Sequence, residues 1–327
     1  MQKQIPKRQI EVRLSLALPF VFRLEDGAYH GKLNSNEFLI HLKYRSINLG
    51  EDTTQQSSFA HKVSTGELTE AHNVNVPGAM LQYSFVTIQF WKRVSSLSNN
   101  KEKIIQNSIT RCHKYLNRFI DIYRFLTLDT EVHPLTIAEF HTTRAGQSLH
   151  YWINCNEEGK FIMGSAFGEP GISTIPKPFG AEINTRIRDM FKAGAQPPII
   201  ELLILNAKSY LEEGEYRLAA IDLGTALDVN VEQVTINLLK QRGELTDQKV
   251  KELERLTTKL IIKNILKHVT EQDITKSREW MSVDNEFRIL RNKVIHDAYE
   301  PTHKEVIEAV EIVRSFQKLL NEAKIKT

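Results

Sequence analysis

Cysteine is scarce in this sequence of 327 residues. Its two cysteines, Cys112 and Cys155, lie in no Cys-x-x-Cys pair and in no Cys/His spacing typical of a zinc site. Such scarcity is typical of proteins from a reducing compartment, and a chain of this length can form a core without disulfides or structural metals. We therefore expect a cytoplasmic protein with no metal site and no cofactor.

Long apolar runs are also missing. No stretch reaches the roughly 18 apolar residues that a membrane-spanning helix needs, and the basic first residues lack the apolar segment and cleavage site of a signal peptide. We therefore expect no membrane partner. Gly-rich phosphate loops, Walker patterns and the Gly-x-Ser-x-Gly elbow are absent as well.

The charge is nearly balanced, with 43 Lys and Arg against 40 Asp and Glu and a net charge of +3. A strongly basic nucleic-acid module would carry a much larger excess of positive charge. Any site for a polyanion must therefore be local and cannot depend on the overall field of the protein.

Residues 1–167 predict a β-rich domain with one long helix. The segments 9–24, 31–47 and 82–94 alternate or are rich in Val, Leu, Ile and Phe, and a hairpin is predicted within 135–155. Residues 99–127 follow helical spacing. The aromatic residues of the third strand, Tyr83, Phe85 and Trp91, are expected to fill a core rather than to stack on bases. The role of this domain is not defined by any motif, and we expect it to sense a trigger or bind a partner.

A linker rich in proline and glycine, residues 168–182, precedes a segment in which every pattern is helical. Residues 183–327 predict five helices with short connections, an all-α up-and-down bundle. The last helix is well signalled, because Thr302 and Glu305 form a capping box. The fold class is therefore α+β overall, with the β-rich part first and the bundle second.

The stretch "RNKVIH" near the end of the fourth bundle helix contains the strongest candidate site, namely Arg291, Asn292 and His296. An Arg and a His at similar spacing also occur at 23–30 and 144–150, but those matches lie across predicted turns, and we interpret them as chance. Only the third match lies on a helix and has a polar amide directly after the Arg.

The bundle sequence "LLILNAKSYLEEGEYRLAAIDLGTALD", followed by "FRILRNKVIHDAYEPTHKEVIEAV", resembles the HEPN family. That family's motif is an Arg, usually followed by Asn, Asp or His, with a His four to six residues further on; Arg291, Asn292 and His296 match it. The resemblance covers about residues 183–327. It implies a helical bundle that forms a homodimer and, where the motif is intact, metal-independent cleavage of RNA. Such enzymes commonly act as toxins or as effectors of antiviral defence.

The residue types suit that chemistry. Histidine has an ordinary pKa of about 6.5 and can accept or donate a proton, while arginine offers a permanent planar charge to a phosphate. Asn292 and His296 are four residues apart and share one helix face, whereas Arg291 and His296 are about 140° apart on an ideal helix. We therefore expect a composite site between two copies of the chain.

Other interpretations remain open. Basic residues near a helix C-terminus also interact favourably with the helix dipole, so the motif can be structural. The main alternative function is a non-catalytic bundle that dimerises and binds a nucleotide, RNA or an antitoxin. The secondary candidates are Lys293 for backbone contact, Asp297 for tuning His296 and Tyr299 for base stacking. Each of them can instead be a solvated or packing residue.

Overall fold

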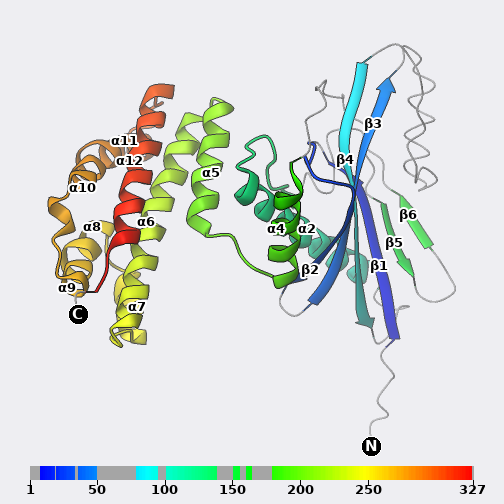
Figure 1. Ribbon diagram of the computed structural model, residues 1–327, viewed down its shortest axis with the longest axis horizontal. Helices are drawn as coiled ribbons and strands as arrows, with labels where there is room; N and C mark the ends of the chain where they lie inside the picture. The colour runs from blue at the N-terminus through cyan, green and yellow to red at the C-terminus, as the bar shows by residue number, and fades with distance from the viewer. Residues whose placement is uncertain are drawn as a thin grey trace, which may run out of the picture. The chain divides into compact units, whose positions relative to one another are not determined.

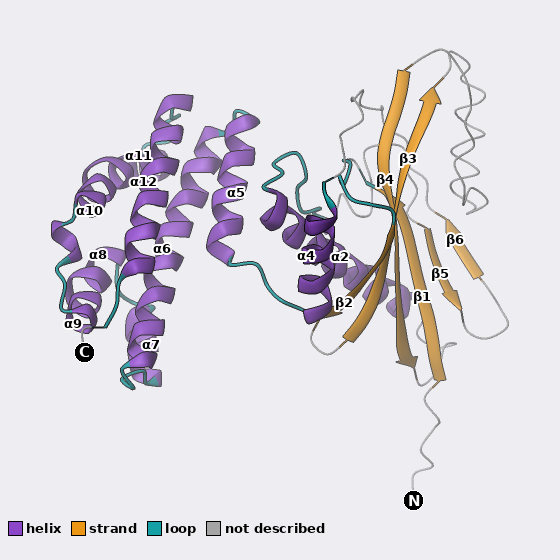
Figure 2. Ribbon diagram, in the orientation of Figure 1, coloured by secondary structure: helices purple, strands orange, loops and turns teal. Residues whose placement is uncertain are grey.

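The computed structural model describes residues 8–18, 20–33, 36–49, 79–94, 101–137, 150–154, 160–163 and 179–325. The chain divides into two compact units, residues 1–196 and 197–327. The described part of the first unit combines strands with helices, and that of the second is helical, so the protein is a mixed α+β protein (Figures 1 and 2). Within the described residues, no helix is both long and apolar enough to span a bilayer.

The described residues of the first unit form a six-stranded antiparallel sheet with the strand order β2-β3-β4-β1-β5-β6. The strands, in chain order, are β1 (Arg8–Ala17), β2 (Gly27–Leu33), β3 (Asn36–Leu49), β4 (Ala79–Val94), β5 (His150–Asn154) and β6 (Lys160–Met163). The composition of residues 25–31, with Asp26 and two glycines, favours a turn, but β2 begins at Gly27. The predicted hairpin within 135–155 lies largely outside the described residues, and β5 pairs with β1 and β6.

The helix α2 (Lys101–Thr127) confirms the long helix predicted in this unit. Alternate side chains of the strands, such as Leu14, Ile40 and Ile88, are buried in one core with Phe119 of this helix. Trp91 does not join that core. Its side chain is 51% exposed, so the prediction that it fills a core is wrong; it alternates with Phe90, which is buried. The side chains of Tyr83 and Phe85 lie outside the described residues.

The helix α4 (Ala181–Ala193) also belongs to the first unit, which corrects the boundary predicted at residues 182 and 183. Its Ile187 and Phe191 are buried in the core of the sheet unit, and the Phe191 ring packs edge-on against Phe38 and Phe119 at 5.0 and 5.1 Å. Gly31 makes room for this contact, because a Cβ there would lie 2.6 Å from both Phe191 and Phe38. This helix is not one of the five helices predicted from the sequence, and the core that it joins follows from contacts that local spacing does not show.

The second unit begins with α5 (Ile199–Glu212) and α6 (Tyr216–Gln241), which pack against each other. Gly214, with a φ of 81°, provides the left-handed residue in the turn between them. The helix α12 (His303–Glu322) lies along α6, as Figure 1 shows, and its Val306, Val313 and Phe316 are buried in the helical core. The capping box of Thr302 and Glu305 is confirmed.

Between α6 and α12 the chain forms shorter helical segments. The apolar spacing at residues 245–269 predicts a single helix, and this is wrong: α7 (Asp247–Leu253) is followed by a break and a second helical run. That run comprises α8 (Thr258–Leu260), the π-helical η1 (Ile261–Leu266) and α9 (Lys267–Thr270). After the 3-10 turn η2 (Ile274–Lys276), a last run comprises α10 (Arg278–Ser282), the π-helical η3 (Val283–Phe287) and α11 (Arg288–His296).

Candidate functional site

The motif residues Arg291, Asn292 and His296 lie on α11, whose backbone positions them. The π-helical η3 directly before α11 rotates the following residues relative to a regular helix, and such bulges are frequent at functional sites. Val294 is the buried residue that anchors α11 in the bundle. The helix ends at His296; Ala298 adopts a positive φ of 50°, and the N–H of Tyr299 donates to the carbonyl of Lys293 at 3.2 Å.

Arg291 is directed towards α6. Its Nη2 donates to Asp228 Oδ2 at 3.0 Å, and the Thr258 hydroxyl donates to the other oxygen of the same carboxylate. The guanidinium lies over Gly224, where a Cβ would approach Arg291 Cδ to 2.6 Å. The Arg291 Nε is buried and has no hydrogen-bond partner within the described residues. Gly224 therefore provides the space that Arg291 occupies, and Asp228 fixes its direction.

Sequence reasoning missed both Gly224 and Asp228 as parts of the site. They lie in "DLGTALD", the segment in which small residues predict close approach of helices. The available signal was the four-residue spacing of the two positions, which places them on one face of α6. Nothing in the sequence identified Arg291 as the side chain that packs there.

Asn292 and His296 are both exposed and are separated by one helical turn. Asn292 lines a pocket together with Arg291, whereas His296 does not line it. The structure thus brings Arg291 and Asn292 together and leaves His296 one turn beyond them. Within one copy, Asp228 holds the Arg291 side chain towards α6, on the pocket that His296 does not line.

The secondary candidates take part in local packing. The Nζ of Lys293 lies 5.7 Å from the centroid of the Tyr299 ring, and the Tyr299 hydroxyl donates to the Glu305 carboxylate at 3.1 Å. That hydrogen bond raises the pKa of Tyr299. Asp297 is the exposed C-cap residue, and its N–H donates to the Lys293 carbonyl at 2.9 Å. These contacts connect the end of α11 to the capping box of α12.

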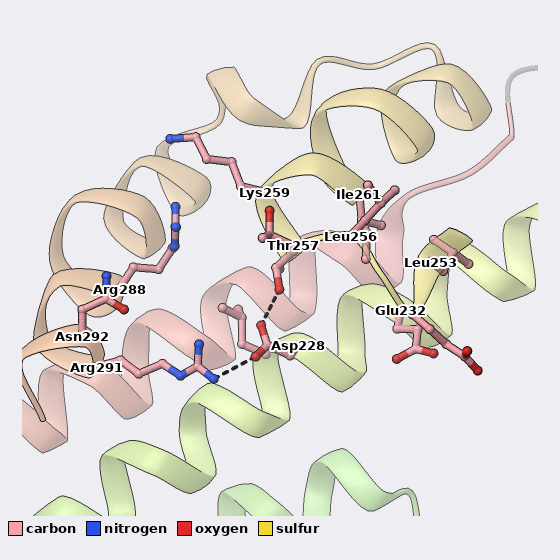
Figure 3. A pocket seen from close by; sticks show the side chains of 13 residues that line it. Asp228, Glu232, Leu253, Leu256, Thr257, Lys259, Ile261, Arg288, Arg291 and Asn292 are labelled. Carbon is pink, nitrogen blue, oxygen red and sulfur yellow. Dashed lines mark hydrogen bonds and ion pairs between the residues drawn. The ribbon is translucent and has the colours of Figure 1, made fainter. Parts of the chain in front are cut away.

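The pocket beside the motif, called the α6–α11 pocket below, has a volume of about 340 Å³ (Figure 3). The helix α11 provides its cationic side, and apolar side chains from α6 and from residues 253–261 form another wall. Its lining residues are Leu227, Asp228, Glu232, Leu253, Glu254, Leu256, Thr257, Thr258, Lys259, Ile261, Arg288, Arg291 and Asn292. It is therefore a mixed polar and apolar site directly next to the motif.

The cations of the α6–α11 pocket are held by carboxylates. Lys259 Nζ lies 2.7 Å from Asp284 Oδ2, and Arg288 pairs with the other oxygen of Asp284. Burial raises the pKa of Asp284, but the hydrogen bonds from Lys259 and Arg288 outweigh it and hold that pKa below its usual value. Asp284 therefore stays ionised near neutral pH and keeps both cations in place.

No group of three or more His, Cys, Asp or Glu side chains in the described residues is placed to hold a metal ion. Comparison with known proteins gives no match: no family model matches the sequence, and no curated protein or solved structure is significantly similar to the chain. The arguments for function therefore depend on the residues and their geometry.

Proposed function

We propose that the helical unit is a HEPN-like bundle that cleaves RNA without a metal ion, and that the protein acts as a toxin or an effector of antiviral defence. One observation carries the proposal. Asn292 and His296 are exposed on one face of α11, beside a pocket that also contains the Arg291 guanidinium. The site thus offers an amide, an imidazole and a cation to a polyanion at the surface.

The reaction uses the nucleophile that RNA itself carries. The 2′-hydroxyl attacks the adjacent phosphorus, a histidine accepts its proton, and the bond to the 5′-oxygen breaks. A second histidine, in its protonated form, donates a proton to the leaving 5′-oxygen. The products are a 2′,3′-cyclic phosphate and a 5′-hydroxyl end. Arginine and asparagine donate hydrogen bonds to the phosphoryl oxygens, where negative charge increases in the transition state.

The two histidines come from two copies of the chain in this proposal. Within one copy, Arg291 is held against α6 while His296 lies one turn further along α11. A two-fold axis beside α11 would bring both sets of residues to one phosphate. Exposed apolar side chains near the motif favour such an interface: Ile221 on α6 is 38% exposed, and Ile289 and Ile295 on α11 are 50% and 47% exposed.

Incubation of the purified protein with total RNA in EDTA tests the proposal. The parent is expected to cleave, and His296→Ala is expected to lose at least about 100-fold, because general acid–base catalysis contributes roughly 10²–10⁴-fold. His268→Ala is the matched control, since His268 is also exposed in the helical unit but lies outside the motif. Equal cleavage by His296→Ala and the parent, or cleavage that EDTA abolishes, would reject the proposal.

The second candidate is a non-catalytic bundle that dimerises and binds a nucleotide, RNA or an antitoxin. The ion pair between Arg291 and Asp228 favours it, because this contact gives the arginine a structural role. Dimerisation without cleavage by the parent would support this candidate. In both cases we assign the binding of a trigger or an antitoxin to the first unit, whose half-exposed Trp91 offers a contact surface.

A further inference from the structure

The α6–α11 pocket has two chemically different ends. Arg288, Arg291 and Asn292 lie together at the α11 side, whereas Glu232 lies at the opposite side, next to Leu253 (Figure 3). The volume of about 340 Å³ is at the lower end of the range of roughly 300–1,000 Å³ found for small-molecule sites. The pocket thus suits one small ligand that carries opposite polarity at its two ends.

The α11 end can bind an anion. Its three cations, Lys259, Arg288 and Arg291, face two carboxylates, Asp284 and Asp228, which leaves one net positive charge. In these ion pairs each guanidinium uses one terminal nitrogen, so further N–H donors remain. Phosphate is an anion that matches such planar donors.

The opposite end offers acceptors. Glu232 lies there, and Glu254 also lines the pocket; neither carboxylate has an ion pair or a hydrogen bond among the described residues. A carboxylate accepts two parallel hydrogen bonds well when the donors are adjacent. The end around Glu232 therefore suits a ligand with neighbouring N–H groups.

The rest of the lining includes an apolar wall of Leu227, Leu253, Leu256 and Ile261. Asp228, which holds Arg291, and Glu232 are one turn apart on α6, about 6 Å along the helix axis. A nucleotide is longer than this from its phosphate to the polar edge of its base, so its phosphate would lie beyond Asp228, on the α11 side of the pocket at Arg288 and Arg291. A flat aromatic base against the apolar wall would place its polar edge at Glu232.

We propose that the α6–α11 pocket binds a single guanine nucleotide, with the phosphate at Arg288 and Arg291 and the base at Glu232. Guanine presents adjacent N1–H and N2–H donors on its Watson–Crick edge, which pair with one carboxylate. Adenine and cytosine present an amino group beside an acceptor nitrogen, and uracil presents one N–H between two carbonyls. The acidic end therefore selects guanine over the other three bases.

The role of this pocket in catalysis rests on the proposed function. Asn292 lines the pocket and His296 lies one turn beyond it on the same face of α11. A guanosine held in the pocket would place its neighbouring phosphate at the rim, beside these two side chains. Cleavage next to guanosine follows from this geometry, whereas binding of a free guanine nucleotide does not depend on cleavage.

Titration calorimetry of the full chain with GMP, AMP, CMP and UMP in EDTA tests the proposal. GMP is expected to bind at least about 10-fold more tightly than the others, because only guanine pairs with one carboxylate through two adjacent donors. Glu232→Gln is expected to remove this preference, and Arg288→Gln to weaken all four nucleotides. Glu286→Gln and Arg278→Gln, at exposed positions outside the pocket, are the matched controls and should bind as the parent does.

Equal binding of the four nucleotides, no binding of GMP, or an unchanged preference in Glu232→Gln would overturn the proposal. His296→Ala separates it from the proposed function, because this variant should bind GMP normally and not cleave RNA. Binding of GMP by a parent that does not cleave would reject the nuclease and keep the pocket. Cleavage by a parent that does not bind GMP would keep the nuclease and reject the pocket.

Discussion

Gly224→Ala tests whether Arg291 needs the space that the missing side chain of Gly224 leaves next to α6. In the parent, the added Cβ would lie 2.6 Å from Arg291 Cδ, so the arginine must leave its position and lose Asp228. Overpacking of this kind costs about 1–3 kcal/mol. Replacing a glycine inside a helix by alanine stabilises it by about 0.5–1 kcal/mol. The net effect in the parent is a small loss of stability with a large loss of any function that requires Arg291.

The effect of Gly224→Ala on stability has the opposite sign when Arg291 is removed first. In an Arg291→Ala background the three atoms nearest to the new methyl group are absent, so Gly224→Ala should stabilise by about 0.5–1 kcal/mol. The double-mutant cycle should therefore give a coupling free energy of about 1–3 kcal/mol between the two positions. Thr225→Ala, an exposed neighbour on α6, should have equal effects in both backgrounds.

Hydrogen exchange of the α6 amides under increasing urea measures these differences, because it reports opening of the helical unit alone. The reasoning would be refuted if Gly224→Ala changed stability equally with and without Arg291. The same result would remove the structural basis for placing Arg291 at the edge of the α6–α11 pocket.

Two further predictions concern each unit in turn. Burial raises the pKa of Asp121 on α2 to about 6, against the opposing effect of Arg124 and Arg118. The folded state then binds a proton more readily than the unfolded one between about pH 4 and 6, so stability of the first unit falls as pH rises through this window. The stability of Asp121→Asn relative to the parent should therefore increase as pH rises through that window, by at most about 3 kcal/mol at 1.36 kcal/mol per pKa unit. Denaturation midpoints of both proteins at pH 4 and pH 7 measure this. The same difference between variant and parent at both pH values would contradict it. Thr302→Ala should lower the free energy of unfolding of the second unit by about 1 kcal/mol, because it removes the hydroxyl that accepts a hydrogen bond from the Glu305 N–H. Urea unfolding measures this. An unchanged free energy of unfolding would show that the capping box does not stabilise α12.

Local patterns predicted the elements that depend on neighbouring residues. The capping box at Thr302 located the start of α12, and helical spacing predicted α2 and α6, because caps and periodicity act over a few residues. The break between α7 and α8 was missed, since the apolar spacing continues across it.

Features that depend on distant contacts were not predictable in this way. The direction of Arg291 follows from an aspartate 63 residues earlier and from the missing side chain at Gly224. The assignment of α4 to the first unit follows from the packing of Phe191 on Phe38 and Phe119. Trp91 is exposed because strand alternation turns it away from buried Phe90, which its aromatic character alone does not show.

The chemical ends of the RNA fragments test the proposed reaction most directly. Attack by the 2′-hydroxyl predicts fragments with 2′,3′-cyclic phosphate and 5′-hydroxyl ends in EDTA, and no cleavage of DNA of the same sequence. Mass spectrometry of the fragments from the parent, with His296→Ala as the reference, measures this. Fragments with 5′-phosphate ends, or the same fragments from His296→Ala, would contradict the proposal that Arg291, Asn292 and His296 cleave RNA through its own hydroxyl.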